Sequence, residues 1–313
     1  MIDPRTMPKP RFIGRVVRAA PSFDAVIING SARFHDLYRD LIAAILVGCR
    51  REPTPVVVAE VAWDLGSAPL SRLLGIEGFS LPSVARLGVQ ALDGDHVTYC
   101  IFSQEERDLF SRTFGVPTER TEVVRFAHTL WSRADGPAHD GGYVFAGGDS
   151  LRDYETLLAA VDGLDVPVRI ATNHDLGPLP ANVTCGPVPY EEYVELIAGA
   201  RLVVVPMRST RRAAGLITYL DAMALGKPTI VTDSPAVGEY VEHGRTGMVV
   251  APEDPHAMRD AITWVLDPVN AGAVEAMRGA ARTSVRHPME YWQSLRDVAE
   301  RAARRDARDA HGP

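Results

Sequence analysis

The chain has 313 residues, of which 46% are hydrophobic and 23% charged, a balance typical of globular proteins and sufficient for two domains. The 33 Lys and Arg residues against 40 Asp and Glu residues give a net charge of −7 without a basic stripe, which argues against a nucleic-acid partner. The first residues lack an apolar signal core, and the longest apolar helix candidate, residues 41–47, is far below the about 20 residues that span a membrane. We therefore expect a cytoplasmic protein without an integral membrane segment. Its oligomeric state does not follow from the sequence.

The three cysteines are scattered, and no cluster of Cys, His or acidic residues has the spacing of metal ligands. We expect buried thiols in a reducing compartment, no metal site and no cofactor.

Short apolar runs alternate with helical stretches in the first half of the chain. Ser103 and Glu106 form a capping box, which predicts that a helix begins there. The strands expected in this half are residues 24–29, 55–61, 97–102 and 121–126, and the helices include residues 12–19 and 35–51. Such alternation predicts an α/β domain with a doubly wound parallel sheet.

A polar, Gly-rich stretch at residues 132–142 has the composition of a linker, and the same alternation restarts after it. The strands expected there are residues 143–146, 166–171, 202–205 and 228–231, and the helices are residues 152–161, 190–200, 216–225, 255–266 and 288–304. We therefore predict a first domain at residues 1–131, a linker at 132–142, a second domain at 143–287, and a carboxyl-terminal helix and tail at 288–313.

The most informative segment is residues 201–251. Two buried strands flank a loop, residues 209–215, that leads into a helix, and this makes one βαβ unit. Ligands of open parallel sheets bind at the carboxyl ends of the strands, where this loop lies. Its helix start favours an anion, and Arg208, Arg211 and Arg212 crowd the same loop. The segment predicts a phosphate site.

Two runs, YLDAMALGKPTIVTD at residues 219–233 and GEYVEHGRTGMVVAP at residues 238–252, resemble the second domain of GT-B glycosyltransferases. They are most similar to the retaining, GT4-like group (glycosyl transferases group 1). The resemblance implies two Rossmann-like domains that face a cleft, with the sugar donor held by the second. Compared with that pattern, we expect the first domain of this chain to be shortened. Of the family's E-x7-E pair, the second position is Asp221 and the first is Ala213.

The predicted turn at Gly147, Gly148 and Arg152 joins a strand to a helix at the ligand-binding edge of the sheet. Paired glycines let a backbone approach a ligand closely, and an arginine at the helix start faces a diphosphate. The alternative is a tight turn with a solvated arginine. The resemblance implies that Arg152 neutralises the leaving diphosphate, and we extend this role to Arg212, with a supporting contact from Arg208. The alternative is a solvated loop, in which only one of Arg208, Arg211 and Arg212 is functional and the other two are peripheral.

The resemblance implies that Asp221 binds the ribose hydroxyls of the donor; a helix-surface position is the alternative. Since Ala213 lacks the family's carboxylate, the donor sugar is either deoxygenated at that carbon or held by another residue. Backbone groups of Gly215, Leu216 and Ile217 remain available for a phosphate.

Gly186 and Val188 resemble the family's segment that contacts the nucleobase, although simple turn chemistry explains the glycine and its prolines equally well. In the first half, Glu60 and Asp64 lie at the end of the second predicted strand, where either could orient an acceptor hydroxyl; a surface or capping role is the alternative. His128 follows the last strand of that half and faces the cleft or lines the hinge.

The sequence therefore predicts a glycosyltransferase that moves a hexose or deoxyhexose from a nucleoside-diphosphate sugar to a hydroxyl of a small molecule or glycan. The resemblance implies retention of configuration without a metal. Two alternatives stay open: an epimerase-like GT-B enzyme, and a non-catalytic subunit that binds nucleotide sugars.

Overall fold

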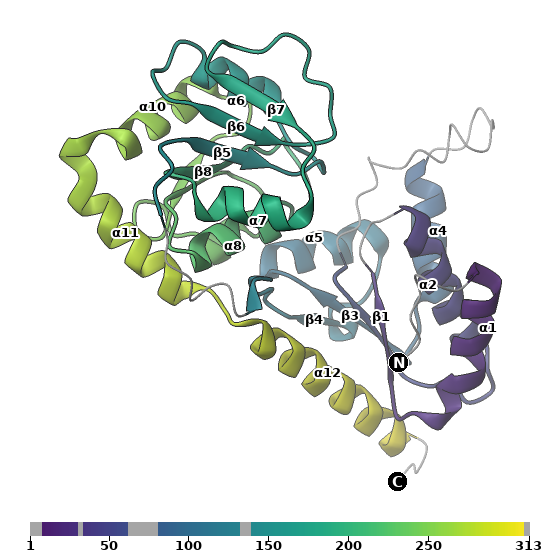
Figure 1. Ribbon diagram of the computed structural model, residues 1–313. Coiled ribbons are helices and arrows are strands. Elements are labelled where there is room, and N and C mark those ends of the chain that lie inside the picture. Colours follow the sequence, from purple (N-terminus) through teal and green to yellow (C-terminus); the bar gives the residue numbers. More distant parts are fainter. Residues whose placement is uncertain (1–7, 31–33, 62–80, 132–138, 310–313) are drawn as a thin grey trace. The chain divides into compact units, whose positions relative to one another are not determined.

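The computed structural model describes residues 8–30, 34–61, 81–131 and 139–309 (Figure 1). The chain forms two compact units. Unit 1 comprises residues 1–125 and 291–313, and unit 2 comprises residues 126–290. Within the described ranges, no helix combines the length and the apolar character needed to cross a membrane.

Unit 1 is built on a four-stranded parallel sheet in the order β1-β2-β3-β4. Its strands follow one another across the sheet in chain order, without a reversal. The strands are β1 (Val26–Asn29), β2 (Val56–Ala59), β3 (Val97–Ile101) and β4 (Thr121–Val123), and the helices are α1 (Lys9–Ala19), α2 (Phe34–Gly48), α4 (Leu81–Leu92), α5 (Gln104–Phe114) and α12 (Pro288–Asp309).

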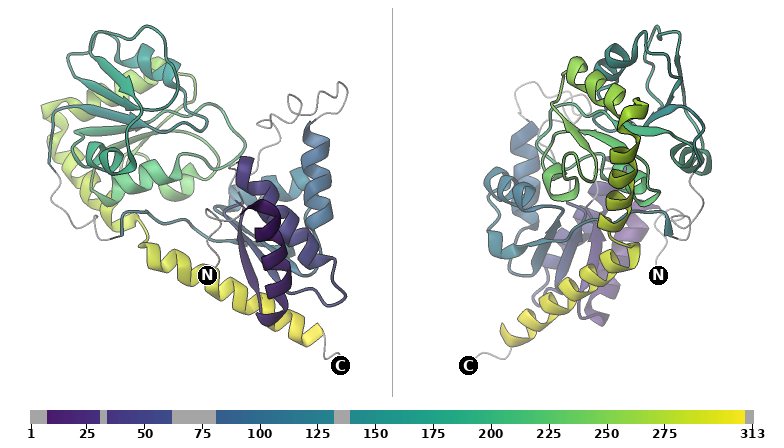
Figure 2. Two further views of the ribbon diagram at one scale, coloured as in Figure 1. Left: turned by 45° about the vertical axis from the view of Figure 1, so that its right-hand side comes forward. Right: turned by 90° about the vertical axis from the view of Figure 1, so that its left-hand side faces the viewer.

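One face of this sheet carries the core of unit 1. Val56, Val58, Tyr99 and Ile101 point into it and meet apolar residues of α2, α4 and α5. Helix α1 lies beside α2, as Figure 2 shows. The predicted capping box is confirmed in part, because Oγ of Ser103 accepts a hydrogen bond from the backbone N–H of Glu106 at 3.0 Å.

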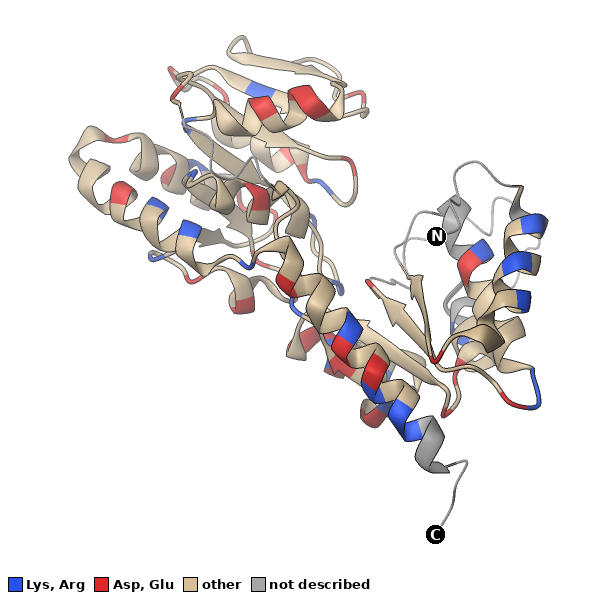
Figure 3. Ribbon diagram, turned by 60° about the horizontal axis from the view of Figure 1, so that its bottom comes forward, with Lys and Arg blue, Asp and Glu red and all other residues tan. Residues whose placement is uncertain are grey.

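Helix α12 belongs to unit 1 from Tyr291 onward. It buries Leu295 and Val298, and its arginines Arg301 and Arg305 pair with Glu122 of β4 at 3.3 and 3.5 Å. Its exposed side carries alternating acidic and basic residues (Figure 3), a pattern that suits a long solvated helix.

Unit 2 contains a six-stranded sheet in the order β10-β9-β8-β5-β6-β7, with every neighbouring pair parallel. The strands are β5 (Val144–Gly147), β6 (Val168–Ala171), β7 (Val183–Gly186), β8 (Leu202–Val205), β9 (Thr229–Thr232) and β10 (Met248–Val250), and the helices are α6 (Tyr154–Val161), α7 (Tyr190–Ala198), α8 (Leu216–Ala224), α9 (Val237–Tyr240), α10 (Pro255–Leu266) and α11 (Ala271–Ser284).

Both faces of this sheet are covered. Val144, Ala146 and Val204 point toward α6 and α10, whereas Phe145 points the other way and packs edge-on against Tyr193 of α7. Helix α8 lies beside α7 on that second face, and α11 packs against α8 (Figure 1). Unit 2 is therefore a three-layer α/β structure.

The sequence missed β7, β10 and α11. Strand β7 reads VTCG between turn residues, with Thr184 exposed, so it lacks the continuous apolar run of a buried strand. Strand β10 has only three residues. The expectation of buried thiols is wrong for Cys49, which is exposed at the end of α2; Cys100 is buried and Cys185 half-buried.

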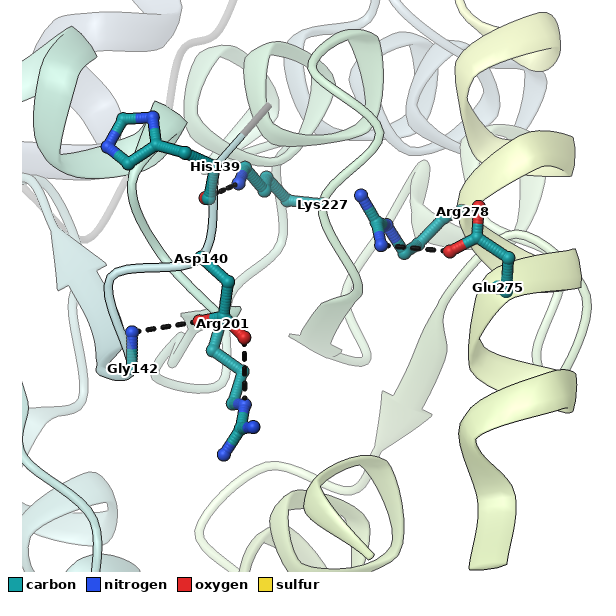
Figure 4. Close-up of polar contacts among 7 residues, drawn as sticks. All are labelled: His139, Asp140, Gly142, Arg201, Lys227, Glu275 and Arg278. Atoms are coloured by element: carbon teal, nitrogen blue, oxygen red, sulfur yellow. Dashed lines mark hydrogen bonds and ion pairs between the residues drawn. The ribbon is translucent and has the colours of Figure 1, made fainter. Parts of the chain in front are cut away.

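The segment that leads into β5 is held at the amino end of the sheet (Figure 4). Lys227 Nζ donates to the carbonyl oxygen of His139 at 2.7 Å. Asp140 accepts hydrogen bonds from the backbone N–H of Gly142 at 2.8 Å and from Nε of Arg201 at 3.2 Å. Of the predicted linker, residues 132–138 lie outside the described residues, and residues 139–142 are tied to unit 2.

Candidate functional site

The strand order of unit 2 reverses beside β5, which pairs with β6 on one side and with β8 on the other. At such a reversal the connections after the two central strands leave toward opposite faces of the sheet, and the crevice between them is the usual ligand site. Here these connections are residues 148–153 and 206–215. They contain most of the residues that the sequence predicts for phosphate binding.

Backbone hydrogen bonds join the two connections. The N–H of Arg208 donates to the carbonyl of Leu151, and the N–H of Asp153 donates to the carbonyl of Pro206, both at 3.0 Å. Arg152 and Met207 form an antiparallel bridge between them. The structure therefore brings two segments that are more than fifty residues apart into one site.

Arg152 is only 8% exposed, and its guanidinium bonds to groups of the turn after β5 and of α8. Its Nε donates to the carbonyl of Gly147 at 2.8 Å, and its Nη2 donates to Oγ1 of Thr218 at 3.0 Å. Thr218 also exchanges a hydrogen bond with the hydroxyl of Tyr193 at 2.9 Å. This network fixes the position of a permanent positive charge at the carboxyl end of β5. A solvated arginine, the alternative interpretation, is wrong.

Two glycines of the site, Gly148 and Gly215, are required by the backbone and by close contacts. Gly148 has φ +103°, and a Cβ there would lie 2.7 Å from Nη2 of Arg152. Gly215 has φ +75°, and its Cβ would lie 2.9 Å from Cγ1 of Val205 and 3.1 Å from Sδ of Met207. These close contacts place the start of α8 directly against the end of β8 and the Arg152 side chain.

Helix α8 begins at Leu216, which is buried, and Ile217 is exposed. The N-cap residue is Gly215, and no side chain caps the first N–H groups of the helix. Such a helix start stabilises an anion by its free N–H groups and its dipole.

The three loop arginines differ in their surroundings. Arg212 is buried, and its Nη2 donates to Oγ of Ser150 at 2.9 Å, which ties the loop before α8 to the turn after β5. Arg208 and Arg211 are exposed, and Nε of Arg208 donates to the carbonyl of Arg152 at 3.3 Å. Hydrogen bonds made by Arg208 and Arg212 therefore help to join the turn after β5, which contains Arg152, to the loop before α8.

Asp149 holds the turn after β5 to the connection after β6. Its carboxylate accepts hydrogen bonds from Oγ1 of Thr172 at 2.7 Å and from the backbone N–H and side chain of Asn173 at 2.8 and 2.7 Å. Partial burial raises the pKa of Asp149, but these hydrogen bonds outweigh it, so the net pKa lies below its ordinary value. The carboxylate is therefore ionised at neutral pH and keeps the turn rigid.

Asp221 is 1% exposed on α8, and both of its oxygens accept hydrogen bonds from Thr129. Oδ1 accepts from the backbone N–H at 2.6 Å, and Oδ2 accepts from Oγ1 at 2.8 Å. Burial raises the pKa of Asp221 to about 6, although the two hydrogen bonds oppose that shift. In this structure the carboxylate anchors residues 126–131 to α8; its binding of ribose stays a prediction.

The remaining predicted residues lie away from the reversal. Gly186 ends β7 at the sheet edge, where its carbonyl accepts from the N–H of Thr172 at 3.1 Å, and Val188 is half-buried beyond it. His128 is buried in unit 2, where its Nδ1 accepts from the N–H of Leu130 at 3.3 Å. Glu60 lies in unit 1, and Asp64 is outside the described residues.

Sequence reasoning missed Thr218, Tyr193 and Thr129. Thr218 had a readable signal, because it is a polar residue in the otherwise apolar start of α8, LITYL. Thr129 had none, since its partner Asp221 is 92 residues away.

Comparison with known proteins finds similar sequences and similar folds among glycosyltransferases. Residues 156–268 match the family model for glycosyl transferases group 1. A D-rhamnosyltransferase of Pseudomonas aeruginosa, WbpZ, is 31% identical over 168 residues, which cover 48% of this chain and 41% of that protein. A lipopolysaccharide core biosynthesis mannosyltransferase of Rhizobium meliloti, LpsB, is 38% identical over 85 residues, which cover 26% of this chain and 24% of that protein. The chain thus matches less than half the length of these curated relatives.

Among solved structures, a glycosyltransferase of Rickettsia africae superposes with a TM-score of 0.67 at 9% identity, covering 96% of this chain and 84% of that one. The HepE protein of Anabaena, solved in complex with UDP-glucose, superposes with a TM-score of 0.66 at 16% identity, covering 94% of this chain and 84% of that one. These likenesses show the fold. The chain has the GT-B fold, and residues 156–268 of its second unit match the glycosyl transferases group 1 model.

Proposed function

We propose that the protein is a glycosyltransferase that transfers a sugar from a nucleoside-diphosphate sugar to an acceptor hydroxyl. One observation carries the proposal: the turn after β5 and the loop before α8 meet at the strand reversal, with Arg152 buried between them. The family match of residues 156–268 includes the loop before α8 and the start of α8, and it begins after the turn that contains Arg152. The names of the curated relatives and the UDP-glucose complex of the Anabaena protein support a nucleotide-sugar donor.

In this proposal the diphosphate of the donor lies against the start of α8. The N–H groups at Leu216 and Ile217, together with Arg152, Arg208 and Arg212, stabilise the negative charge that grows on the diphosphate as the glycosidic bond breaks. Arg152 and Arg212 act mainly by being held in place, because preorganised donors cost no reorganisation during the reaction. Gly186 and Val188 are proposed to contact the nucleobase. Retention of configuration and independence of a metal stay predictions from the sequence resemblance.

The first test is calorimetric titration with UDP, GDP and TDP. We expect one of them to bind, and Arg212→Gln to weaken it by about tenfold or more, because a charge-assisted hydrogen bond contributes about 1.5–3 kcal/mol. Arg201→Gln is the matched control, since Arg201 is an exposed arginine at the amino end of β8. Absence of binding by all three nucleotides at millimolar concentration would contradict a diphosphate site.

Turnover separates a transferase from a binding subunit. Incubation with a panel of nucleotide sugars, with and without sugar acceptors, is expected to release nucleotide faster when an acceptor is present. A protein that binds the nucleotide and releases none under any condition is a binding subunit. A protein that converts the donor into a second nucleotide sugar is an epimerase-like enzyme.

A further inference from the structure

Arg152 is a buried cation that is held by uncharged groups. The acceptors of its guanidinium are the carbonyls of Gly147 and Ser150, Sδ of Met207 and Oγ1 of Thr218, at 2.8, 3.2, 2.8 and 3.0 Å. Among the described residues it therefore has hydrogen bonds but no ion pair. Buried charges are normally paired, because an isolated charge is costly to remove from water. The positive charge of this arginine is thus left open to an anion.

The carboxylates of the same turn and of α8 all have other partners. Asp149 accepts hydrogen bonds from the connection after β6, and Asp221 accepts two from Thr129. Asp153 caps α6, because it accepts from the backbone N–H and from Oγ1 of Thr156 at 3.1 and 2.6 Å. These bonds keep three neighbouring negative charges from pairing with the guanidinium.

Two hydroxyls occupy the position beside the guanidinium where a carboxylate could form an ion pair. Thr218 is 4% exposed in the first turn of α8, and its Oγ1 lies 2.9 Å from the hydroxyl of Tyr193 on α7. Burial raises the pKa of Tyr193, although its hydrogen bonds with Thr218 and Arg152 and the charge of Arg152 oppose that rise. The phenol is therefore uncharged at neutral pH. A guanidinium has no lone pair, so both hydroxyl oxygens act as its acceptors.

Packing fixes the phenol ring of this hydroxyl pair against the end of β5. A Cβ at Gly147 would lie 2.5 Å from Cε2 and 2.9 Å from Oη of Tyr193, so the ring fits only beside a glycine. The same ring packs edge-on against Phe145, with the centroids 5.3 Å apart. Helices α7 and α8 thus each contribute one uncharged hydroxyl to the same cation.

We propose that Tyr193 and Thr218 are positioning residues that hold Arg152 by uncharged hydroxyls, so that its positive charge is kept for the diphosphate of the donor. This inference rests on the proposed transferase function. A carboxylate at position 218 would also orient the guanidinium, but it would compensate the charge and repel an anion at the start of α8. The uncharged hydroxyl pair therefore makes the site select an anionic ligand.

Thr218→Asp separates this role from a purely structural hydrogen bond. Aspartate can pair with Arg152 and is favourable in the first turn of a helix, so the Tm is expected not to fall. The nucleotide that the wild type binds, among UDP, GDP and TDP, is expected to bind this variant about tenfold or more weakly, because the charge is compensated. Calorimetric titration and thermal unfolding of the full chain measure both effects. An affinity equal to that of the wild type would overturn the proposal, since either acceptor satisfies a structural bond.

Removal of each hydroxyl tests the pair without adding a charge. Thr218→Val and Tyr193→Phe are each expected to weaken nucleotide binding by about tenfold, and Thr218→Ser to recover most of the affinity lost in Thr218→Val. The matched controls are Thr229→Val and Tyr143→Phe, which remove buried hydroxyls bonded to backbone carbonyls at 3.0 and 2.8 Å at the amino end of the same sheet. Unchanged binding by the two site variants would overturn the proposal, and so would equal losses in the controls.

Inorganic pyrophosphate distinguishes the two proposals, because it carries the charge without a nucleobase or a sugar. Binding of a nucleotide by the wild type that is unchanged in Thr218→Asp and Thr218→Val rejects the hydroxyl pair and leaves the transferase proposal standing. Pyrophosphate binding that is lost in these variants, while no nucleotide binds, supports the pair as part of an anion site and rejects the nucleotide site. Absence of binding by every probe rejects both.

Discussion

Asp221 makes contacts in the structure that differ from the role that the sequence resemblance implies for it. The family resemblance implies a ribose ligand, whereas in the structure its two oxygens accept both hydrogen bonds that Thr129 offers. The residue is fully enclosed, so its charge is partly desolvated and its pKa rises to about 6. A carboxylate that anchors the chain as it enters unit 2 therefore couples the stability of this unit to pH.

The sign of this coupling follows from the two pKa values. The folded state holds the proton of Asp221 up to about pH 6, and the unfolded state releases it near 3.8. The raised pKa therefore adds to the free energy of unfolding below pH 3.8. This addition is lost as the pH rises through 6, which lowers the free energy of unfolding by about 3 kcal/mol. We expect Asp221→Asn to become more stable relative to the wild type by about that amount between pH 4 and pH 7. Urea unfolding at several pH values measures this difference, and a difference independent of pH would contradict it.

The two connections at the strand reversal act as one element. The turn after β5 and the loop before α8 share backbone hydrogen bonds, and the Arg152 side chain lies between them. The arrangement is tightly packed at Gly215, because a Cβ there would lie 2.9 Å from Cγ1 of Val205 and 3.1 Å from Sδ of Met207, closer than ordinary van der Waals contact. The position of the α8 start is therefore set by close packing, and a small displacement moves every group proposed to contact the diphosphate.

Gly215→Ala tests this tight packing against a control with the same backbone. Gly163 has φ +74° with no atom within 4 Å of its Cβ position, whereas Gly215 has φ +75° in a crowded site. Both substitutions are expected to lower the free energy of unfolding by about 1–2 kcal/mol, because alanine is disfavoured in the left-handed conformation. Only Gly215→Ala is expected to cost more than that and to weaken nucleotide binding by about tenfold or more. Thermal unfolding and calorimetry check both effects, and equal behaviour of the two variants would show that the packing around Gly215 is unimportant.

At the scale of the whole molecule, the last helix completes the unit in which the chain begins. From Tyr291 on, α12 contributes buried Leu295 and Val298 and the ion pairs with Glu122 to unit 1. Unit 1 is thus made of two segments separated by all of unit 2. Its stability depends on contacts between residues that are far apart in sequence.

Leu295→Ala is expected to destabilise unit 1 by about 2–5 kcal/mol, because Leu295 is 1% exposed and its truncation leaves a cavity. Trp292→Ala on the same helix is the control, since Trp292 is 53% exposed. Nucleotide binding by unit 2 is expected to survive at temperatures where unit 1 of the Leu295→Ala variant has melted. Calorimetric unfolding with and without UDP follows both transitions, and a single transition shifted by both ligand and substitution would contradict independent units.

Local patterns in the sequence were sufficient for most elements of the fold. The strands β2, β3, β8 and β9 are fully buried and rich in apolar and β-branched residues, so their strand character is readable without tertiary information. Strand β7 was missed because it is short, half-exposed and flanked by turn residues. The predicted division at residue 131 falls six residues after the observed one. The reason is that Phe126 and Thr129 bond to Tyr240 and Asp221 of unit 2, which composition alone does not reveal.

By itself, the sequence determined that this is a parallel α/β protein, that Gly147, Gly148 and Arg152 follow one strand, and that Arg208–Gly215 follows another. Those features depend on neighbours within a few residues, where hydrophobic period and turn chemistry act. Only the tertiary structure decided that β5 and β8 are adjacent, that Asp221 binds Thr129, and that Tyr291 reaches Glu60 across 231 residues. Strand order and buried side-chain partners result from the packing of the whole chain, so no local pattern specifies them.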